Sequence, residues 1–176
     1  GKEFWNKGRV EKVIEGKEDY EYSSDGKHEK KKKKNGFHDG TWKGYSNRLN
    51  CSYTELYEDG KFVSGVSIDS NNIEYQYKEM FSKPKPKKGI DDFYRYMGNN
   101  MRRTKEADIN KISGKIYLTF VVDKNGSIDE IKIIKGLGYG LDEEAITTLK
   151  SYRNWIPGKM KGINVRVMYS LPLTLK

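Results

Sequence analysis

The most regular stretch of the chain runs from Lys115 to Ile134 and reads KIYLTFVVDKNGSIDEIKII. Its first eight positions alternate, which puts four apolar residues on one face of a strand: Ile116, Leu118, Phe120 and Val122. An Asn-Gly turn follows within Asp123 to Gly126, and Ile128 to Ile134 returns as a second strand. The stretch therefore predicts an antiparallel hairpin with one buried face.

Segments whose apolar residues have helical spacing lie before and after this hairpin. Two acids open the segment from Asp91 to Met101, whose apolar residues share one helical face: Phe93, Tyr96, Met97 and Met101. A second helix, 141–152, has acids in its first turn and one apolar face: Leu141, Ala145, Leu149 and Tyr152. The last run, Gly162 to Lys176, alternates again and predicts one long strand. Pro172 within it cannot donate to a ladder, which marks an edge strand.

The first half of the chain has a different pattern. Asp-Gly pairs recur at 25–26, 39–40 and 59–60, and short alternating runs rich in aromatic residues flank them. Asp-Gly favours tight hairpin turns because its glycine tolerates a positive φ. A unit of about 20 residues is typical of repeat arrays, so we expect antiparallel β-hairpin repeats. An irregular antiparallel meander is the alternative.

A change of composition near residue 82 divides the chain. We expect a β-hairpin repeat domain at 1–81, a linker at 82–89 and an α/β module at 90–176. The linker carries two prolines and four lysines, which favour a semi-rigid, extended spacer. Hydrophobic residues make up 35% and charged residues 34% of the chain, so two thin sheet-based cores fit better than one large core. The predicted fold class is α+β.

The charge balance and the absence of apolar runs limit the function classes. A formal net charge of +9 allows nucleic acid, an anionic membrane surface or acidic partners. We interpret the lysine run from Lys30 to Lys34 as a solvated loop. No run of about 18 apolar residues is present, and no signal peptide. The chain starts at Gly1, so we expect its natural start to lie upstream.

Residue patterns that carry catalysis or metal binding are missing. His28, His38 and Cys51 lack the spacing of zinc ligands. The glycines at 136–140 precede a helix, but they lack the final glycine of a dinucleotide fingerprint and the Lys-Ser/Thr of a P-loop. The acids at 142–144 fit a helix start better than a catalytic carboxylate pair. We therefore predict a non-enzymatic protein without catalytic residues, metal or cofactor.

Several short motifs follow one another in a fixed order after residue 90: Phe93–Tyr96, Gly114–Tyr117, Phe120–Ile128, Leu141–Ala145, Trp155–Lys159, Gly162 and Val165–Val167. In this order they resemble the C-terminal domain of TonB proteins, in the form typical of Bacteroidetes. The resemblance implies a three-stranded antiparallel sheet with two helices. In the first half, Asp39–Trp42, Tyr57–Lys61 and Ser64-Gly65 resemble MORN-type repeats over about 20–77.

The TonB resemblance implies the periplasmic part of an energy transducer. Such a protein has an upstream inner-membrane anchor, couples to an ExbB–ExbD-type motor and docks TonB-dependent outer-membrane transporters. An exposed sheet edge can take up an extended TonB-box peptide by strand addition. By analogy with the family's last strand, we expect the partner-binding edge at Val165, Arg166, Val167, Met168, Tyr169 and Ser170. Arg166 would pair with acids beside the TonB box; a solvent-facing strand residue is the alternative.

One departure from the family supports a second hypothesis. The family usually has Tyr-Pro just after the first helix, in a region that contacts the receptor, and Arg103-Thr104 stands there in this chain. The alternative is a non-transducing periplasmic binding or adaptor module that uses both halves for protein interaction. A third hypothesis, nucleic-acid binding through the lysines and aromatic residues, has no recognisable motif, and we predict no nucleic-acid partner. A homodimer stays open.

Overall fold

The computed structural model describes residues 3–6, 9–12, 20–23, 33–34, 37–38 and 40–176. These residues belong to two compact units. Unit 1 contains residues 1–14, 83–158 and 166–176. Unit 2 contains residues 15–82 and 159–165. The second unit therefore takes a short segment from the C-terminal half of the chain.

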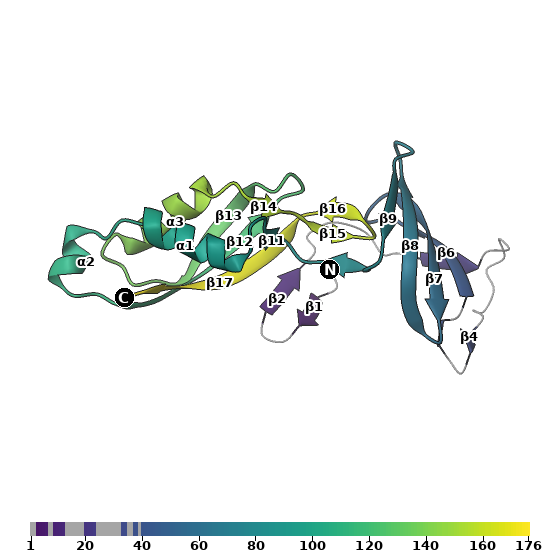
Figure 1. Ribbon diagram of the computed structural model, residues 1–176, viewed down its shortest axis with the longest axis horizontal. Coiled ribbons are helices and arrows are strands. Elements are labelled where there is room, and N and C mark those ends of the chain that lie inside the picture. Colours follow the sequence, from purple (N-terminus) through teal and green to yellow (C-terminus); the bar gives the residue numbers. More distant parts are fainter. Residues whose placement is uncertain (1–2, 7–8, 13–19, 24–32, 35–36, 39) are drawn as a thin grey trace. The chain divides into compact units, whose positions relative to one another are not determined.

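Unit 1 is a mixed α+β structure (Figure 1). Its described elements are β1 (Glu3–Asn6), β2 (Arg9–Lys12), β11 (Lys85–Pro86), α1 (Ile90–Asn100), α2 (Lys105–Ile109), β12 (Gly114–Val122), β13 (Ile128–Lys135), α3 (Leu141–Ser151), β14 (Trp155–Ile156) and β17 (Val167–Leu175). The main sheet has the antiparallel order β13-β12-β17, and two small antiparallel pairs, β1-β2 and β11-β14, accompany it. The predicted fold class, α+β with antiparallel sheets, is confirmed.

The core of unit 1 is built on one face of β12. The four residues predicted to share a face, Ile116, Leu118, Phe120 and Val122, are all at most 1% exposed. The opposing helices contribute Phe93 and Met97 from α1 and Leu141, Ala145 and Leu149 from α3. Fully burying one large apolar side chain contributes roughly 1.5–3 kcal/mol. Both predicted helical faces are therefore the surfaces that cover the sheet.

Trp155 is the centre of an aromatic cluster in this core. Its ring centroid lies 5.3 Å from that of Phe120, 5.5 Å from Phe93 and 5.2 Å from Tyr169, each with edge-on geometry. Such pairs add about 0.5–1.5 kcal/mol beyond the area they bury. The cluster thus joins the central strand, α1 and β17.

The hairpin turn between β12 and β13 forms at the predicted Asn-Gly. Gly126 donates from its backbone N–H to the Asp123 carbonyl at 2.9 Å and has φ 80°, a conformation that glycine adopts without strain. The Asn125 side chain accepts from Ser127 N–H at 2.9 Å and holds the turn from the other side. Local turn chemistry therefore sets the register of this hairpin.

Two predictions for the C-terminal half need correction. The described residues contain a third helix, α2, where two helices were expected, because Thr104 caps its N-terminus by accepting from Ala107 N–H. The single strand expected from Gly162 to Lys176 is two strands. Its first part, β16 (Ile163–Val165), pairs with β15 (Gly158–Met160), and β17 begins only after Arg166.

Unit 2 is a set of antiparallel sheets. Its described strands are β3 (Tyr20–Ser23), β4 (Lys33–Lys34), β5 (Phe37–His38), β6 (Gly40–Ser46), β7 (Cys51–Glu58), β8 (Lys61–Asp69), β9 (Glu74–Tyr77) and β10 (Phe81–Ser82), joined by β15 and β16. The largest sheet has the order β3-β6-β7-β8-β9, in which neighbours along the chain are neighbours in space, and a smaller sheet has the order β10-β15-β16.

The predicted Asp-Gly turns fall partly within the described residues. Asp59 and Gly60 join β7 to β8 with φ 47° and 81°, as a tight hairpin turn requires. The pair at 25–26 lies outside the described residues, and so does Asp39. The predicted linker, 82–89, contains β11, whose Lys85 and Pro86 pair with β14. This segment is therefore held by backbone pairing for part of its length.

Two tyrosines lie directly across glycines in this sheet. Gly44 pairs with Tyr53, and Gly65 pairs with Tyr77. A Cβ placed on Gly44 would lie 2.3 Å from the Tyr53 ring, and one on Gly65 would lie 2.2 Å from the Tyr77 ring. Each ring therefore fills the space that a side chain on the facing strand would need.

Replacing Gly65 by alanine tests this packing. Because the new methyl group collides with the Tyr77 ring, we expect Gly65→Ala to lower the free energy of unfolding of unit 2 by about 1–3 kcal/mol. Gly98→Ala is the matched control, since a Cβ at Gly98 in α1 meets nothing within 4 Å and alanine is favoured in a helix by roughly 0.5–1 kcal/mol. Urea unfolding followed through NMR signals of β7 and β8 gives the comparison. Equal stability of Gly65→Ala and the parent chain would contradict the packing.

Candidate partner-binding site

The strand β17 lies at the end of the main sheet of unit 1. It pairs with β12 without a break from Val167 opposite Val122 to Leu175 opposite Gly114. Tyr169, Leu171 and Leu173 are at most 5% exposed and face the core. The backbone of β2 approaches the same strand. One side of β17 is therefore paired with β12, and β2 approaches the strand as well.

The residues expected to form the partner-binding edge fall into two elements. Val165 ends β16 and is buried in unit 2, whereas Val167, Met168, Tyr169 and Ser170 begin β17. Met168 and Ser170 are half-buried on the face opposite the core. Arg166 joins the two strands.

Arg166 is surrounded by acids of its own chain. It donates from Nη2 to Glu130 Oε1 at 2.9 Å, and Asp123 and Asp129 each have an oxygen 3.8 Å from its guanidinium. The hydrogen bond to Glu130 raises the pKa of Arg166 above its ordinary value. The guanidinium therefore stays charged and lies against the β12–β13 hairpin.

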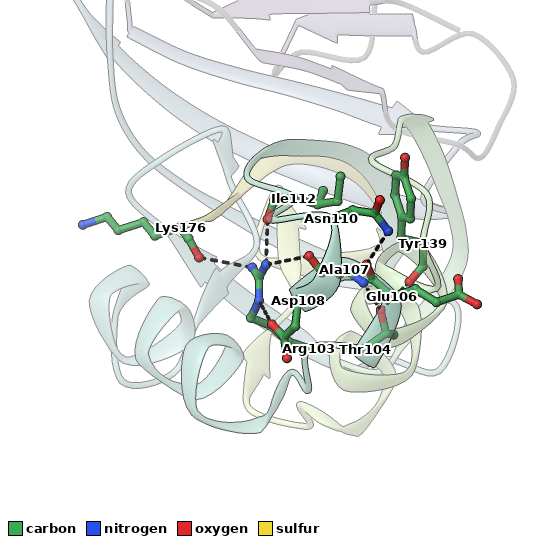
Figure 2. Close-up of polar contacts among 9 residues, drawn as sticks. All are labelled: Arg103, Thr104, Glu106, Ala107, Asp108, Asn110, Ile112, Tyr139 and Lys176. Atoms are coloured by element: carbon green, nitrogen blue, oxygen red, sulfur yellow. Dashed lines mark hydrogen bonds and ion pairs between the residues drawn. The ribbon is translucent and has the colours of Figure 1, made fainter.

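Arg103 organises the segment after α1 (Figure 2). Its guanidinium donates to Asp108 Oδ1 at 2.7 Å, to the Ile112 carbonyl at 2.8 Å and to the backbone oxygen of Lys176 at 3.1 Å. A fourth, longer bond reaches the Ala107 carbonyl at 3.3 Å. The planar fork of arginine can serve several acceptors at once, so one side chain ties the C-terminal part of α2 and the residues after it to Lys176, which follows β17.

Thr104 completes this arrangement. Its hydroxyl caps α2 and also donates to the Tyr139 carbonyl at 2.5 Å, in the loop before α3 (Figure 2). The pair Arg103-Thr104 therefore links α2 to both β17 and the loop before α3. These residues stabilise the domain through contacts within the chain.

A groove of about 770 Å³ lies between α1 and the C-terminal half of β17. Its apolar lining comes from Tyr94, Met97 and Met101 on one side and Pro172, Leu173 and Leu175 on the other, with Arg95 and Arg103 among the remaining residues. The sequence analysis missed this groove, because its two sides are about 75 positions apart in the chain. The available signal in the sequence was Tyr94, an aromatic residue outside the apolar set of this helix.

The glycine-rich loop before α3 holds an anion of its own chain. Asp142 accepts from the backbone N–H groups of Leu137 at 2.9 Å and Gly138 at 3.1 Å. A Cβ on Gly136 would lie 2.1 Å from its carboxylate. The loop therefore closes around the Asp142 carboxylate, which satisfies two of its backbone N–H groups.

Two general features concern the described part of the chain. Within it, the structure contains no group of three or more His, Cys, Asp or Glu side chains placed to hold a metal ion. None of its helices is long and apolar enough to cross a membrane. His28 lies outside the described residues, and Cys51 is buried in β7.

Residues 104–175 match the family model described as Gram-negative bacterial TonB protein C-terminal. The predicted resemblance to TonB is thereby confirmed for this part of the chain. A similar solved structure is the NMR solution structure of the Helicobacter pylori TonB C-terminal domain, residues 194–285, with 23% sequence identity and a TM-score of 0.41. The similarity covers 49% of this chain and 91% of that one. No curated protein matches the chain.

The role of Arg103 can be tested by Arg103→Lys. Lysine keeps the charge but cannot reach all the acceptors, so we expect unit 1 to lose on the order of 1–2 kcal/mol of unfolding free energy. The amides of α2 should also exchange faster with solvent. Arg102→Lys is the matched control at the exposed neighbouring position and should change stability by less than about 0.5 kcal/mol. Similar effects of both substitutions would contradict the tie between α2 and β17.

Proposed function

We propose that this chain is the periplasmic part of a TonB-like energy transducer that docks outer-membrane TonB-dependent transporters by strand addition. The family match of residues 104–175 supports the proposal, together with the position of β17 at the end of its sheet. In this proposal an upstream inner-membrane anchor couples the chain to an ExbB–ExbD-type motor. The docking edge is the proposed set Val165–Ser170, with its paired part in β17.

The position of Pro172 indicates which backbone groups face the edge. Proline has no N–H to give to β12, so it is tolerated where the backbone polar groups of β17 point away from that strand. These groups alternate sides along a strand, and the register of β17 with β12 is unbroken. Met168 and Ser170 are separated from Pro172 by an even number of positions, so their N–H and C=O groups also point away from β12, toward the proposed docking edge.

The groove beside β17 adds a source of selectivity. A peptide that pairs with β17 and continues toward Leu175 passes the apolar surface of Tyr94, Met97 and Met101. Backbone pairing supplies affinity that depends little on sequence, whereas pockets for alternate side chains discriminate between sequences. We therefore expect peptides with apolar residues beyond the paired segment to bind more tightly.

Titration of a TonB-box peptide against isotope-labelled protein tests the docking edge. We expect chemical-shift changes to centre on Val167–Ser170. Ser170→Pro removes one outward N–H and should weaken binding about two- to twelvefold, which corresponds to the roughly 0.5–1.5 kcal/mol typical of one backbone hydrogen bond. Ser170→Ala keeps the N–H and is the matched control.

Two outcomes would count against the proposal. One is a titration to millimolar peptide without shifts in β17, and the other is equal binding by Ser170→Pro and Ser170→Ala. Because β2 approaches β17, the titration is repeated on a chain without residues 1–14. Tighter binding after this deletion is expected if β2 competes with the peptide for the edge.

A non-transducing adaptor is the second candidate. It is favoured by Arg103 and Thr104, whose polar groups are engaged within the domain at the place where the family has its receptor-contacting Tyr-Pro. In this reading the antiparallel sheet of unit 2, with its repeated glycine–tyrosine pairs, is a MORN-like module that binds a further partner. The upstream gene sequence separates the two candidates. A single transmembrane helix with a Pro-rich spacer supports transduction, and a lipoprotein signal supports the adaptor.

A further inference from the structure

A buried ion pair joins two distant parts of the sequence within unit 2. Lys161, in the turn between β15 and β16, has its Nζ 2.5 Å from Glu55 Oε1 in β7. The side chains of Lys161 and Glu55 are 7% and 1% exposed. Two opposite charges so far from water are costly to bury and are tolerated only where their geometry and hydrogen bonds are nearly complete.

Tyrosines complete the surroundings of Glu55. Tyr57 donates its hydroxyl to Glu55 Oε2 at 2.9 Å, and Tyr77 donates to Oε1 at 2.7 Å. Burial, followed by the hydrogen bond to Glu55, raises the pKa of Tyr77 far above its ordinary value, so this hydroxyl remains a donor. The carboxylate therefore has two neutral donors from the sheet and one cation from the β15–β16 hairpin.

The tip of the β15–β16 hairpin contacts this face of the sheet through its backbone as well as through the charge of Lys161. Lys161 Nζ lies 3.6 Å from the Tyr53 ring centroid, a cation–π contact. The Lys161 carbonyl accepts from the Ser67 hydroxyl at 2.7 Å, and its N–H donates to the Met80 carbonyl. At the next position, a Cβ on Gly162 would lie 2.9 Å from the Cβ of Tyr75. A side chain at position 162 would collide with Tyr75, so the hairpin tip can approach the sheet this closely only with glycine after Lys161.

From these contacts we infer that the Glu55 face of the five-stranded sheet is a binding surface whose ligand is the Lys161–Gly162 tip of the chain's own β15–β16 hairpin. The hairpin is specific for this surface through one buried cation. It attaches the segment between β14 and β17 to unit 2, although the sequence pattern assigns that segment to the TonB-like part. The inference stands whether or not β17 binds a transporter.

The attachment has a consequence for β17. The chain leaves the hairpin at Val165 and enters β17 two positions later, at Val167. Arg166 is therefore the single residue between β16 and the proposed docking strand, and residues 162–166 separate Lys161 from β17. The Lys161–Glu55 pair therefore holds the segment that directly precedes β17 in the chain.

Hydrogen exchange on the full 176-residue chain tests the inference with Lys161→Met. Methionine keeps the length of the side chain but leaves Glu55 buried without its cation, which typically costs several kcal/mol. We expect amides of β7, β8, β15 and β16 to exchange on the order of a hundredfold faster, with little change in β12 and β13. Lys159→Met, at an exposed position of the same hairpin, is the matched control and should leave all four strands protected.

A double variant separates the ion pair from general damage. Glu55→Gln keeps acceptor and donor groups for the tyrosines without the charge, so Lys161→Met combined with Glu55→Gln should exchange more slowly than Lys161→Met alone. Recovery of this kind, or selective opening of the unit 2 strands, supports the inference. The inference is overturned if the amides of these strands are as well protected in the Lys161→Met chain as in the Lys159→Met chain. It is also overturned if the effects of Lys161→Met and Glu55→Gln on exchange are additive. Peptide binding by β17 is measured separately, so failure of one proposal does not imply failure of the other.

Discussion

The pairing of β12 on both sides is the constraint on which unit 1 depends. Its core-facing side chains, Ile116, Leu118, Phe120 and Val122, are almost completely removed from water, and every helix of the unit packs from that side. Because the side-chain period of a strand is two, a slip of one residue would turn this entire set toward solvent. The same register fixes the position of each residue of β17, and with it the edge available for strand addition.

The parts of the fold that the sequence predicts well are those with local causes. Alternation and the Asn-Gly turn predict β12 and β13, and apolar spacing predicts α1 and α3. The break at Arg166 had no local signal, since the alternation continues through it from Ile163 to Leu175. That break follows from the pairing of β16 with β15, a tertiary preference. The helix α2 was missed because five residues are too few to show a period.

The docking edge stays a prediction, and the structure adds the contacts of its residues. The resemblance to the family predicts the edge near β17, and β17 lies at the end of the sheet β13-β12-β17. The partners of Arg166 and Arg103 come from other elements, so neither sequence neighbourhood could reveal them. Glu55 did carry a signal: it alternates in phase with Tyr53 and Tyr57, which places a charge on an aromatic face. A buried carboxylate at such a position needs a partner of opposite charge. The sequence does not identify that partner, because Lys161 is 106 positions away.

The hairpin around Lys161 also bears on how such a protein can be recombined. A boundary drawn near residue 90 treats everything after it as one exchangeable cassette. The structure assigns 159–165 to the other unit, so a transplanted C-terminal cassette from a relative would bring a foreign tip to the Glu55 face. Without a lysine followed by glycine there, the recipient sheet would keep an uncompensated carboxylate in its interior. Successful chimaeras should therefore exchange the N-terminal sheet and this seven-residue segment together.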